Sequence, residues 1–320
     1  MSHFATTGWP FYGWNPWSFV EDSGSGSCAP RPDQGTFLAG SFQHGPDCLQ
    51  YKLYIPGSHR GESIPLIVML HGCGQSADDF ALGTGMNALA EQAPCMVLYP
   101  EQSQGANWNR CWNWYDEAHH ARGEGEPGLI AALTEHLMLE YPIDRARVSV
   151  AGLSAGGAMA VILGRTYPDV FKAVGCHSGL PHGSARDGVS AMLAMRTGAD
   201  FASLSQATPL PTPTIVFHGD VDQTVHQQNS ADVVQQALAC YTSQVPGESR
   251  ETAMCEQTGE TSGRSFTRHT HRGESGDVVA EHWTIHGTGH AWSGGNHHGS
   301  YTDTRGPDAS KEMLRFFLQR

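Results

Sequence analysis

The amino-acid sequence predicts an α/β protein with a mostly parallel, doubly wound sheet and helices on both faces. Segments with the pattern of strands alternate along the chain with segments that have the pattern of helices. The run PLIVML at 65–70 is continuously apolar, as expected for a central strand that is buried on both faces. The segment 126–141 is amphipathic and has a proline near its start, as helices often do. Such alternation is typical of parallel strands joined by helical crossovers.

The first part of the predicted domain consists mainly of strands. Apolar residues alternate in 37–42 and 49–56, as in half-buried strands, and the buried strand 65–70 follows. A helical pattern at 81–93 leads to another apolar strand at 95–100.

The middle of the chain continues the alternation. The helix 126–141 precedes a strand at 147–152, a helix at 155–168 begins almost at once, and a strand follows at 171–178. The strand at 147–152 and the next helix leave room for only a very short turn between them.

The last third of the chain completes the pattern without an internal repeat. A strand at 212–219 precedes a helix at 230–241, and the segments 265–272 and 278–287 can pair as late strands. A closing helix is predicted at 308–319. Residues 36–320 are therefore predicted to form one domain.

Residues 1–35 differ in composition from this domain. They are rich in aromatic residues at first and then in Gly, Ser and Pro, which is typical of an irregular extension and a linker. Two roles remain open for the aromatic part. It can pack as a strap over the domain, or it can dock on a water-insoluble partner.

Composition and charge exclude several classes of protein. The chain of 320 residues has a formal net charge of −13 and no cluster of Lys or Arg, which argues against a nucleic-acid partner. No apolar stretch approaches the roughly 20 residues that span a bilayer, so no membrane insertion is expected. The N-terminus has no basic and apolar regions of a secretory signal, so the sequence as written predicts a cytoplasmic protein. Secretion or export to the periplasm stays open if a signal was removed.

Ser154 lies in a predicted turn with glycines two residues before it and two residues after it. The motif Gly152-Leu-Ser154-Ala-Gly156 lies between a predicted strand and a predicted helix. Such a sharp turn strains the backbone at its central residue, and its neighbours need small side chains because the flanking elements approach closely. The turn presents the Ser154 hydroxyl at the carboxyl edge of the sheet and places a helix N-terminus behind it. Ser154 is therefore the predicted nucleophile.

A serine nucleophile requires a base and an orienting carboxylate, which in this arrangement follow it in the order acid, then histidine. Asp220 and Asp222 both follow the strand 212–219, and the HGxxDxxV pattern favours Asp222. His290 lies in a glycine-rich loop between the last strand and the last helix and is preferred over His286 at the strand end. The predicted catalytic residues are Ser154, Asp222 and His290.

The oxyanion formed during acyl transfer needs two backbone N–H donors. The loop HGCGQS follows the strand 65–70, and its glycines allow amides to face the reaction centre. We expect the N–H groups of Cys73 and Ala155 to form the oxyanion hole. No HExxH pattern is present and no Gly-rich loop fits a phosphate or dinucleotide cradle, so no metal and no cofactor is predicted.

With these motifs the chain resembles the polyhydroxybutyrate depolymerase family of α/β-hydrolases, which is related to feruloyl and acetylxylan esterases. The resemblance extends over roughly 40–320 and depends on LIVMLHGCGQSADDF, CWNWYD, AGLSAGGAMA, FHGDVDQTV and GHAWSGG. It implies an α/β-hydrolase fold, a Ser-Asp-His triad and carboxylic ester substrates. It also implies a disulfide between Cys73 and Cys111.

The resemblance leaves three functions open. The first is a serine esterase that acts on short-chain hydroxyalkanoate polyester or its oligomers, and the second is an esterase for aryl or acetyl esters of plant polysaccharide. The third is a non-catalytic protein that binds hydrophobic granules. Trp112, Trp114 and Trp292 lie in loops near the predicted site and can either line an apolar substrate cleft or pack in the core. The sequence does not predict an oligomeric state.

Overall fold

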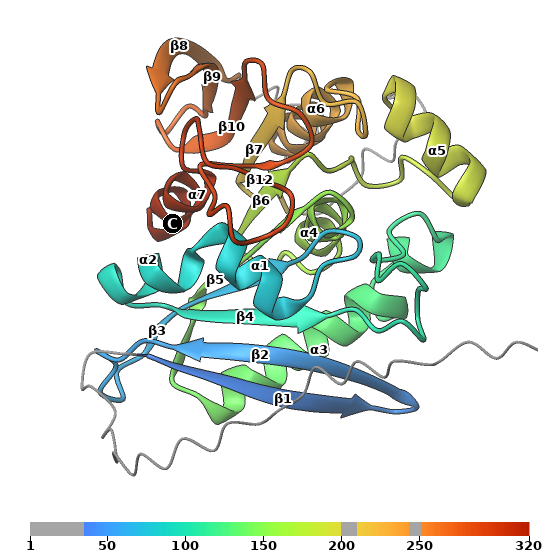
Figure 1. Ribbon diagram of the computed structural model, residues 1–320, viewed down its shortest axis with the longest axis vertical. Helices are drawn as coiled ribbons and strands as arrows, with labels where there is room; N and C mark the ends of the chain where they lie inside the picture. The colour runs from blue at the N-terminus through green and yellow to red at the C-terminus, as the bar shows by residue number, and fades with distance from the viewer. Residues whose placement is uncertain (1–34, 200–209, 243–250, 320) are drawn as a thin grey trace, which may run out of the picture. The chain divides into compact units, whose positions relative to one another are not determined.

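The computed structural model describes residues 35–199, 210–242 and 251–319. Apart from Gly35, the predicted extension at 1–35 lies outside these residues, and its two alternative roles remain predictions. Within the described residues, the main sheet has ten strands in the order β1-β2-β4-β3-β5-β6-β7-β10-β9-β8 (Figure 1).

The strands are β1 (Thr36–His44), β2 (Asp47–Ile55), β3 (Ile64–Leu70), β4 (Met96–Glu101), β5 (Ile143–Leu153), β6 (Ala173–His177), β7 (Thr214–Gly219), β8 (Ala253–Thr261), β9 (Arg264–Arg272) and β10 (Val278–Ile285), with a separate small pair β11 (Trp292–Ser293) and β12 (Thr302–Asp303). The helices are α1 (Ala77–Thr84), α2 (Met86–Gln92), α3 (Gly125–Glu140), α4 (Ala155–Thr166), α5 (Gly188–Thr197), α6 (Gln228–Thr242) and α7 (Ala309–Leu318), with a 3₁₀ turn at Glu117–His120.

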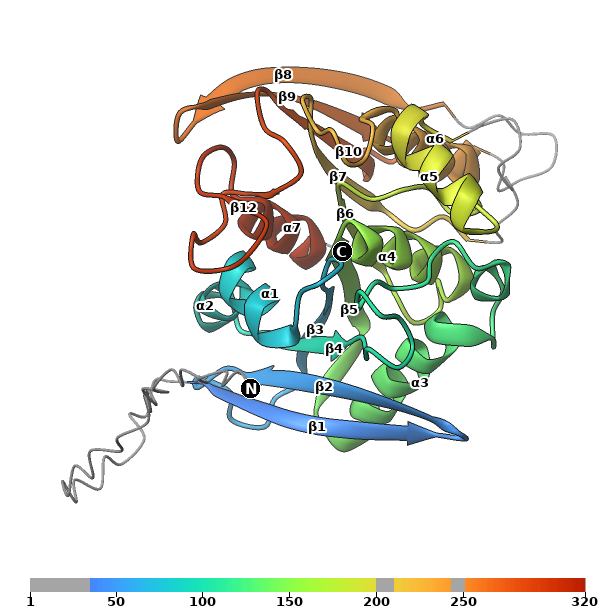
Figure 2. The same ribbon diagram turned by 45° about the vertical axis from the view of Figure 1, so that its right-hand side comes forward.

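The centre of the sheet is parallel and its two ends are antiparallel. Neighbouring strands from β4 through β3, β5, β6 and β7 to β10 all run parallel. The pairs β1-β2, β2-β4, β10-β9 and β9-β8 are antiparallel. Helices lie on both sides of the central strands (Figure 2). The predicted doubly wound, mostly parallel sheet is confirmed.

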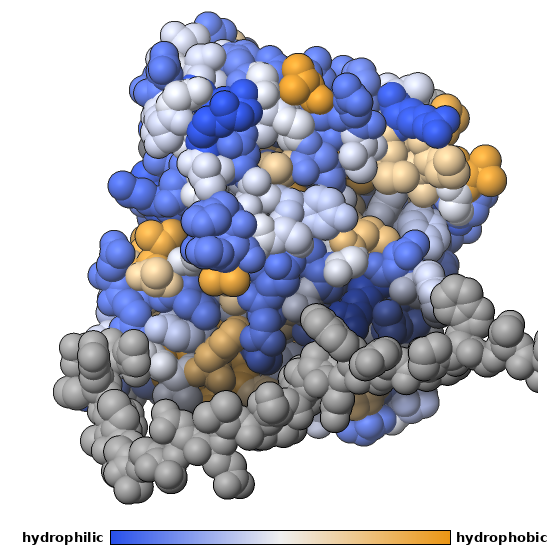
Figure 3. Space-filling view, viewed as in Figure 1, coloured by the Kyte–Doolittle hydropathy of each residue, from blue (hydrophilic) through white to orange (hydrophobic). Residues whose placement is uncertain are grey.

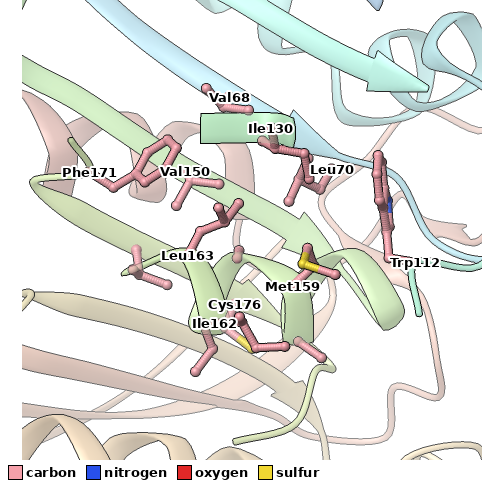
Figure 4. Close-up of a cluster of buried hydrophobic side chains, with 14 of the residues drawn as sticks. Val68, Leu70, Trp112, Ile130, Val150, Met159, Ile162, Leu163, Phe171 and Cys176 are labelled. Atoms are coloured by element: carbon pink, nitrogen blue, oxygen red, sulfur yellow. The ribbon is translucent and has the colours of Figure 1, made fainter. Parts of the chain in front are cut away.

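The strand β3 divides its side chains between two cores. Leu66, Val68 and Leu70 belong to one buried cluster, which includes α3 and α4 side chains, and Figure 4 shows Val68 and Leu70 within it. Ile67 and Met69 belong to a second cluster with side chains of α1, α2 and α7. Successive side chains of a strand point to opposite faces, so a strand covered on both faces is apolar throughout.

Three elements differ from the sequence prediction. The helix predicted at 81–93 is two helices, α1 and α2, because the chain turns at Gly85 with a φ of 64°. The helix α5 was not predicted because Val189 and Leu193 are exposed and no apolar stripe marks a buried face. The strand β8 was not predicted because nearly all its side chains are exposed, so no alternation appears in the sequence.

The surface of the described residues is mainly hydrophilic. On the face shown in Figure 3, hydrophilic residues predominate and apolar residues form separate small patches. Among the described residues, the helices are too short or too polar for any of them to traverse a bilayer.

The contact of α4 with the end of β3 leaves no room for a side chain at Gly156. A Cβ atom there would lie 2.1 Å from the carbonyl oxygen of Leu70 and 2.5 Å from that of His71. We expect Gly156→Ala to lower the free energy of unfolding by about 2 kcal/mol or more, because backbone must move to admit the methyl group. Urea unfolding followed by circular dichroism measures the change.

The matched control is Gly188→Ala at the start of α5. A Cβ atom at Gly188 meets nothing within 4 Å, so this substitution is expected to change stability by less than about 0.5 kcal/mol. Equal stability of the two variants would contradict the close contact between α4 and β3.

Candidate active site

Ser154 occupies the turn between β5 and α4 in a strained conformation. Its φ of 56° and ψ of −118° lie in a region that residues other than glycine rarely adopt. Its N–H donates to the carbonyl of His177 (2.9 Å), which ties the turn to the end of β6. The constraint holds Ser154 at the carboxyl edge of the parallel strands, as the glycine pattern predicts.

A cavity of about 260 Å³ surrounds Ser154 and His290. Its lining consists of Gly72, Cys73, Leu153, Ser154, Met195, Thr224, His290 and Tyr301. The described residues include no hydrogen bond between the Ser154 hydroxyl and His290. Such bonds are often long before substrate is bound and shorten in the complex.

The structure pairs His290 with Asp222. The Nδ1–H of His290 donates to Asp222 Oδ2 (2.7 Å), which leaves Nε2 available to a substrate or to the Ser154 hydroxyl. The other carboxylate oxygen accepts the N–H groups of Thr224 (2.8 Å) and Val225 (2.9 Å). The Asp222 side chain is fully buried, so these donors fix its position.

Electrostatics keep Asp222 ionised. Burial by itself acts to raise the pKa of this carboxyl, but its contacts with the rings of His218 and His290 lower it, together with the Val225 N–H. The result is a pKa well below the usual range of an aspartate. A carboxylate in this state orients the imidazole and stabilises its cation.

Asp220 and His286, the alternative candidates for the acid and the base, contact each other. His286 Nδ1 lies 2.8 Å from Asp220 Oδ2, and the Gly287 N–H donates to Asp220 Oδ1 (2.7 Å). The other ring nitrogen of His286 lies 2.9 Å from the Thr267 hydroxyl. Neither Asp220 nor His286 lines the cavity of Ser154. Their contacts connect the loop after β7 to the end of β10.

The two predicted oxyanion donors lie at the same edge of the sheet. Cys73 lines the cavity, and Ala155 is the first residue of α4 after Ser154. Among the described residues, no hydrogen bond uses the amide of Cys73 or of Ala155. Two such N–H groups near a nucleophile are the donors that a tetrahedral oxyanion requires.

The loop of Cys73 is fixed by a disulfide and by hydrogen bonds. Cys73 and Cys111 form the disulfide that the family resemblance implies. The Gly72 N–H donates to Gln75 Oε1 (2.8 Å), and the Gly74 N–H donates to the carbonyl of Asn109 (2.7 Å). These bonds join the loop after β3 to the loop after β4.

The carboxylate of Glu126 stabilises the same loops through hydrogen bonds. Glu126 accepts hydrogen bonds from the Asn113 N–H (2.7 Å), the Asn113 side chain (2.6 Å) and Gln102 Nε2 (2.5 Å). Gln102 Nε2 also donates to the carbonyl of Cys111 (3.1 Å). Burial raises the pKa of Glu126, although the nearby His119 and these donors act to lower it. The pattern of the sequence gave no sign of this network.

Buried histidines hold the strand ends that surround the triad. His177 Nε2 accepts the N–H of Ser293 (3.0 Å), and burial, with the neighbouring His218 and His290 rings, lowers the pKa of His177 to about 3. His218 Nε2 donates to the carbonyl of Val225 (2.8 Å), which closes the loop that carries Asp222. Both side chains are buried. The sequence could have indicated these two histidines, because both lie at the ends of predicted strands.

The three predicted substrate tryptophans pack inside the protein. Trp112, Trp114 and Trp292 are all buried, and none lines the cavity of Ser154. The Trp112 indole donates to the carbonyl of His71 (3.1 Å), and that of Trp292 donates to the Ser310 hydroxyl (3.0 Å). We therefore leave them out of the proposed substrate site, where Met195 and Tyr301 lie instead.

The described residues contain no group of three or more His, Cys, Asp or Glu side chains arranged to hold a metal ion.

Comparison with known proteins identifies the family. The model of the family described as Esterase PHB depolymerase matches residues 49–254. The chain belongs to this family. It is 32% identical to poly(3-hydroxyalkanoate) depolymerase C of Paucimonas lemoignei, over 78% of this chain and 60% of that protein. It is 36% identical to feruloyl esterase B of Neurospora crassa, over 37% of this chain and 39% of that protein. The chain thus spans about three fifths or less of the length of these relatives.

Solved structures confirm the α/β-hydrolase fold. An acetyl xylan esterase from Aspergillus awamori superposes with a TM-score of 0.63 over 89% of this chain and 100% of that one, at 18% identity. An S-formylglutathione hydrolase from Agrobacterium tumefaciens superposes with a TM-score of 0.57 over 90% of this chain and 96% of that one, at 15% identity.

The two Asp–His pairs allow the triad to be tested with a matched control. We expect Asp222→Asn to lower kcat for a p-nitrophenyl ester by about 10⁴-fold, because the amide cannot hold the His290 tautomer that accepts a proton. Asp220→Asn is expected to leave kcat within a few fold of the wild type. The reverse ranking, measured in steady-state kinetics, would assign the acid to Asp220.

The disulfide closes a loop between residues 38 positions apart. Replacing Cys73 and Cys111 together by Ser is expected to lower the free energy of unfolding by about 4 kcal/mol or less and to lower kcat/KM, because the oxyanion loop loses its tether. The exposed Cys255, replaced by Ser, is the control. Peptide mapping after alkylation without reductant should find Cys73 and Cys111 unmodified; their modification would contradict the disulfide.

Proposed function

We propose that the protein is a serine-dependent carboxylic ester hydrolase whose preferred substrates are short-chain polyhydroxyalkanoates or their oligomers. The observation that carries the proposal is the pairing of His290 with Asp222 at the cavity that contains Ser154. The family and the depolymerase relative support the choice of polyester.

The proposed mechanism follows from the geometry. His290 Nε2 takes the proton of the Ser154 hydroxyl as the serine oxygen attacks the ester carbonyl, and Asp222 stabilises the imidazolium. The N–H groups of Cys73 and Ala155 bind the oxyanion. His290 then protonates the leaving alcohol, and water attacks the acyl-enzyme by the same route in reverse. No cofactor takes part.

The Cys73–Cys111 disulfide gives information about the cellular compartment of the protein. Such bonds persist in oxidising environments and are rare where thiols are kept reduced. Cys73–Cys111 therefore supports secretion or a periplasmic location rather than the cytoplasm.

Release of 3-hydroxybutyrate from amorphous polyhydroxybutyrate tests the proposal. The wild type is expected to release monomer or oligomer, and Ser154→Ala is expected to lose at least about 10⁴-fold in rate, since the variant has no nucleophile. A short p-nitrophenyl ester is the control substrate.

The other outcomes distinguish the alternatives. Cleavage of the small ester without the polymer would keep the esterase but overturn the polymer as substrate, and hydroxybutyrate oligomers and feruloyl or acetylated xylan substrates would be tested next. Activity on neither substrate would overturn the hydrolase and favour the granule-binding protein.

A further inference from the structure

A second hollow lies beside the cavity of Ser154. It has a volume of about 480 Å³, and its lining includes Cys73, Trp108, Arg110 and Tyr301. Cys73 and Tyr301 also line the cavity of Ser154, so the two spaces share a wall. An extended substrate can therefore lie with one ester at Ser154 and continue across Tyr301 into the second hollow.

Arg110 is the one charged side chain among the described residues that line the second hollow. It is half-buried, and within the described part of the chain its guanidinium makes no hydrogen bond and no ion pair. A planar guanidinium binds a carboxylate through two parallel hydrogen bonds. No acidic side chain lines the hollow to compete for it. In a chain with a net charge of −13, this cation gives the site a local attraction for anions.

The loop holds the backbone of Arg110 in one place. Its φ of 51° is left-handed, and its N–H donates to the carbonyl of Asn107 (2.8 Å). The Asn107 side chain also accepts the N–H of Asn109 (2.9 Å) and of Cys111 (3.3 Å). Cys111 is in turn bonded to Cys73 of the proposed oxyanion hole. Because the backbone at Arg110 is already fixed, only its side chain must be ordered when a ligand arrives.

The remaining walls suit an apolar chain. Trp108 is 84% exposed and Tyr301 is 54% exposed, although large aromatic side chains usually bury most of their surface. Together with Arg110 they offer apolar area beside a single cation. A short aliphatic ester chain that ends in a carboxylate has the complementary chemistry.

We propose that Arg110 binds the ionised carboxyl end of a short hydroxyalkanoate oligomer while an ester bond of the same molecule lies at Ser154. The proposal rests on the proposed function and adds its substrate class: free-acid oligoesters are preferred over the same chains with a capped carboxyl group. Each hydrolysis adds water across one ester and leaves an alcohol and a new carboxylate, so shortened free-acid chains remain substrates.

The test compares the full chain with Arg110→Gln, Arg110→Lys and Arg145→Gln. Arg145 is an exposed arginine near the start of β5, at the opposite end of the strand from Ser154, so Arg145→Gln controls for the loss of one positive charge. The substrates are the linear trimer of 3-hydroxybutyrate as the free acid, its methyl ester, and p-nitrophenyl butyrate.

Arg110→Gln is expected to raise KM for the free acid by roughly 10- to 100-fold with kcat nearly unchanged, because a charge-assisted bidentate contact is lost. KM for the methyl ester and for p-nitrophenyl butyrate should not change. Arg110→Lys should fall in between, Arg145→Gln should match the wild type, and the wild-type preference for the free acid should shrink as NaCl is added.

Two results would overturn the proposal. One is an equal loss on the free acid and the methyl ester in Arg110→Gln, which would mean that Arg110 only shapes the loop. The other is a wild type that hydrolyses p-nitrophenyl butyrate but shows no preference for the free acid. A wild type without activity on any ester would instead overturn the proposed function, and this inference with it.

Discussion

The close packing of α4 against the end of β3 is the constraint on which the site depends. Gly152 and Gly156 allow the backbone of the turn to approach the carbonyl of Leu70 within distances that no side chain permits. This approach forces Ser154 into its strained conformation and places the first amide of α4 beside the loop after β3. The proposed nucleophile and oxyanion donors are thus positioned by one backbone contact, which involves no side chain.

The rest of the site is positioned by loops that polar side chains fix from within. His218 closes the loop of Asp222, and His177 holds the residues that follow His290. Burial lowers the pKa of His177 and keeps the ring neutral, so it can accept a backbone N–H without adding a positive charge behind the triad. These two histidines fix the loops of Asp222 and His290, although neither lines the cavity of Ser154.

The hollow beside the proposed triad would extend the site beyond a single ester in the binding mode proposed above. Cys73, Cys111 and Arg110 lie on two loops that the disulfide and a backbone hydrogen bond join. The same connection that stiffens the proposed oxyanion hole therefore fixes the backbone of Arg110, whose side chain lines the neighbouring hollow. In the proposed binding mode, the two joined loops set both the position of the ester at Ser154 and the position of the carboxylate at Arg110.

The sequence by itself determined the parallel sheet, the serine at its turn and the preference for Asp222 and His290. Each of these leaves a local mark: a continuous apolar run such as 65–70, glycines around Ser154, and an acid or a histidine directly after a strand. The sequence also indicated the family, and through it the disulfide.

The sequence favoured Asp222, but only the tertiary structure showed that Asp222 pairs with His290 and Asp220 with His286, since these partners lie more than 60 residues away in the chain. It also decided that the three predicted tryptophans pack inside, that Met195 of the unpredicted α5 and Tyr301 line the cavity, and that Arg110 faces the hollow beside it. These relations join residues far apart in the chain, and a residue's own neighbours in sequence carry no record of such contacts.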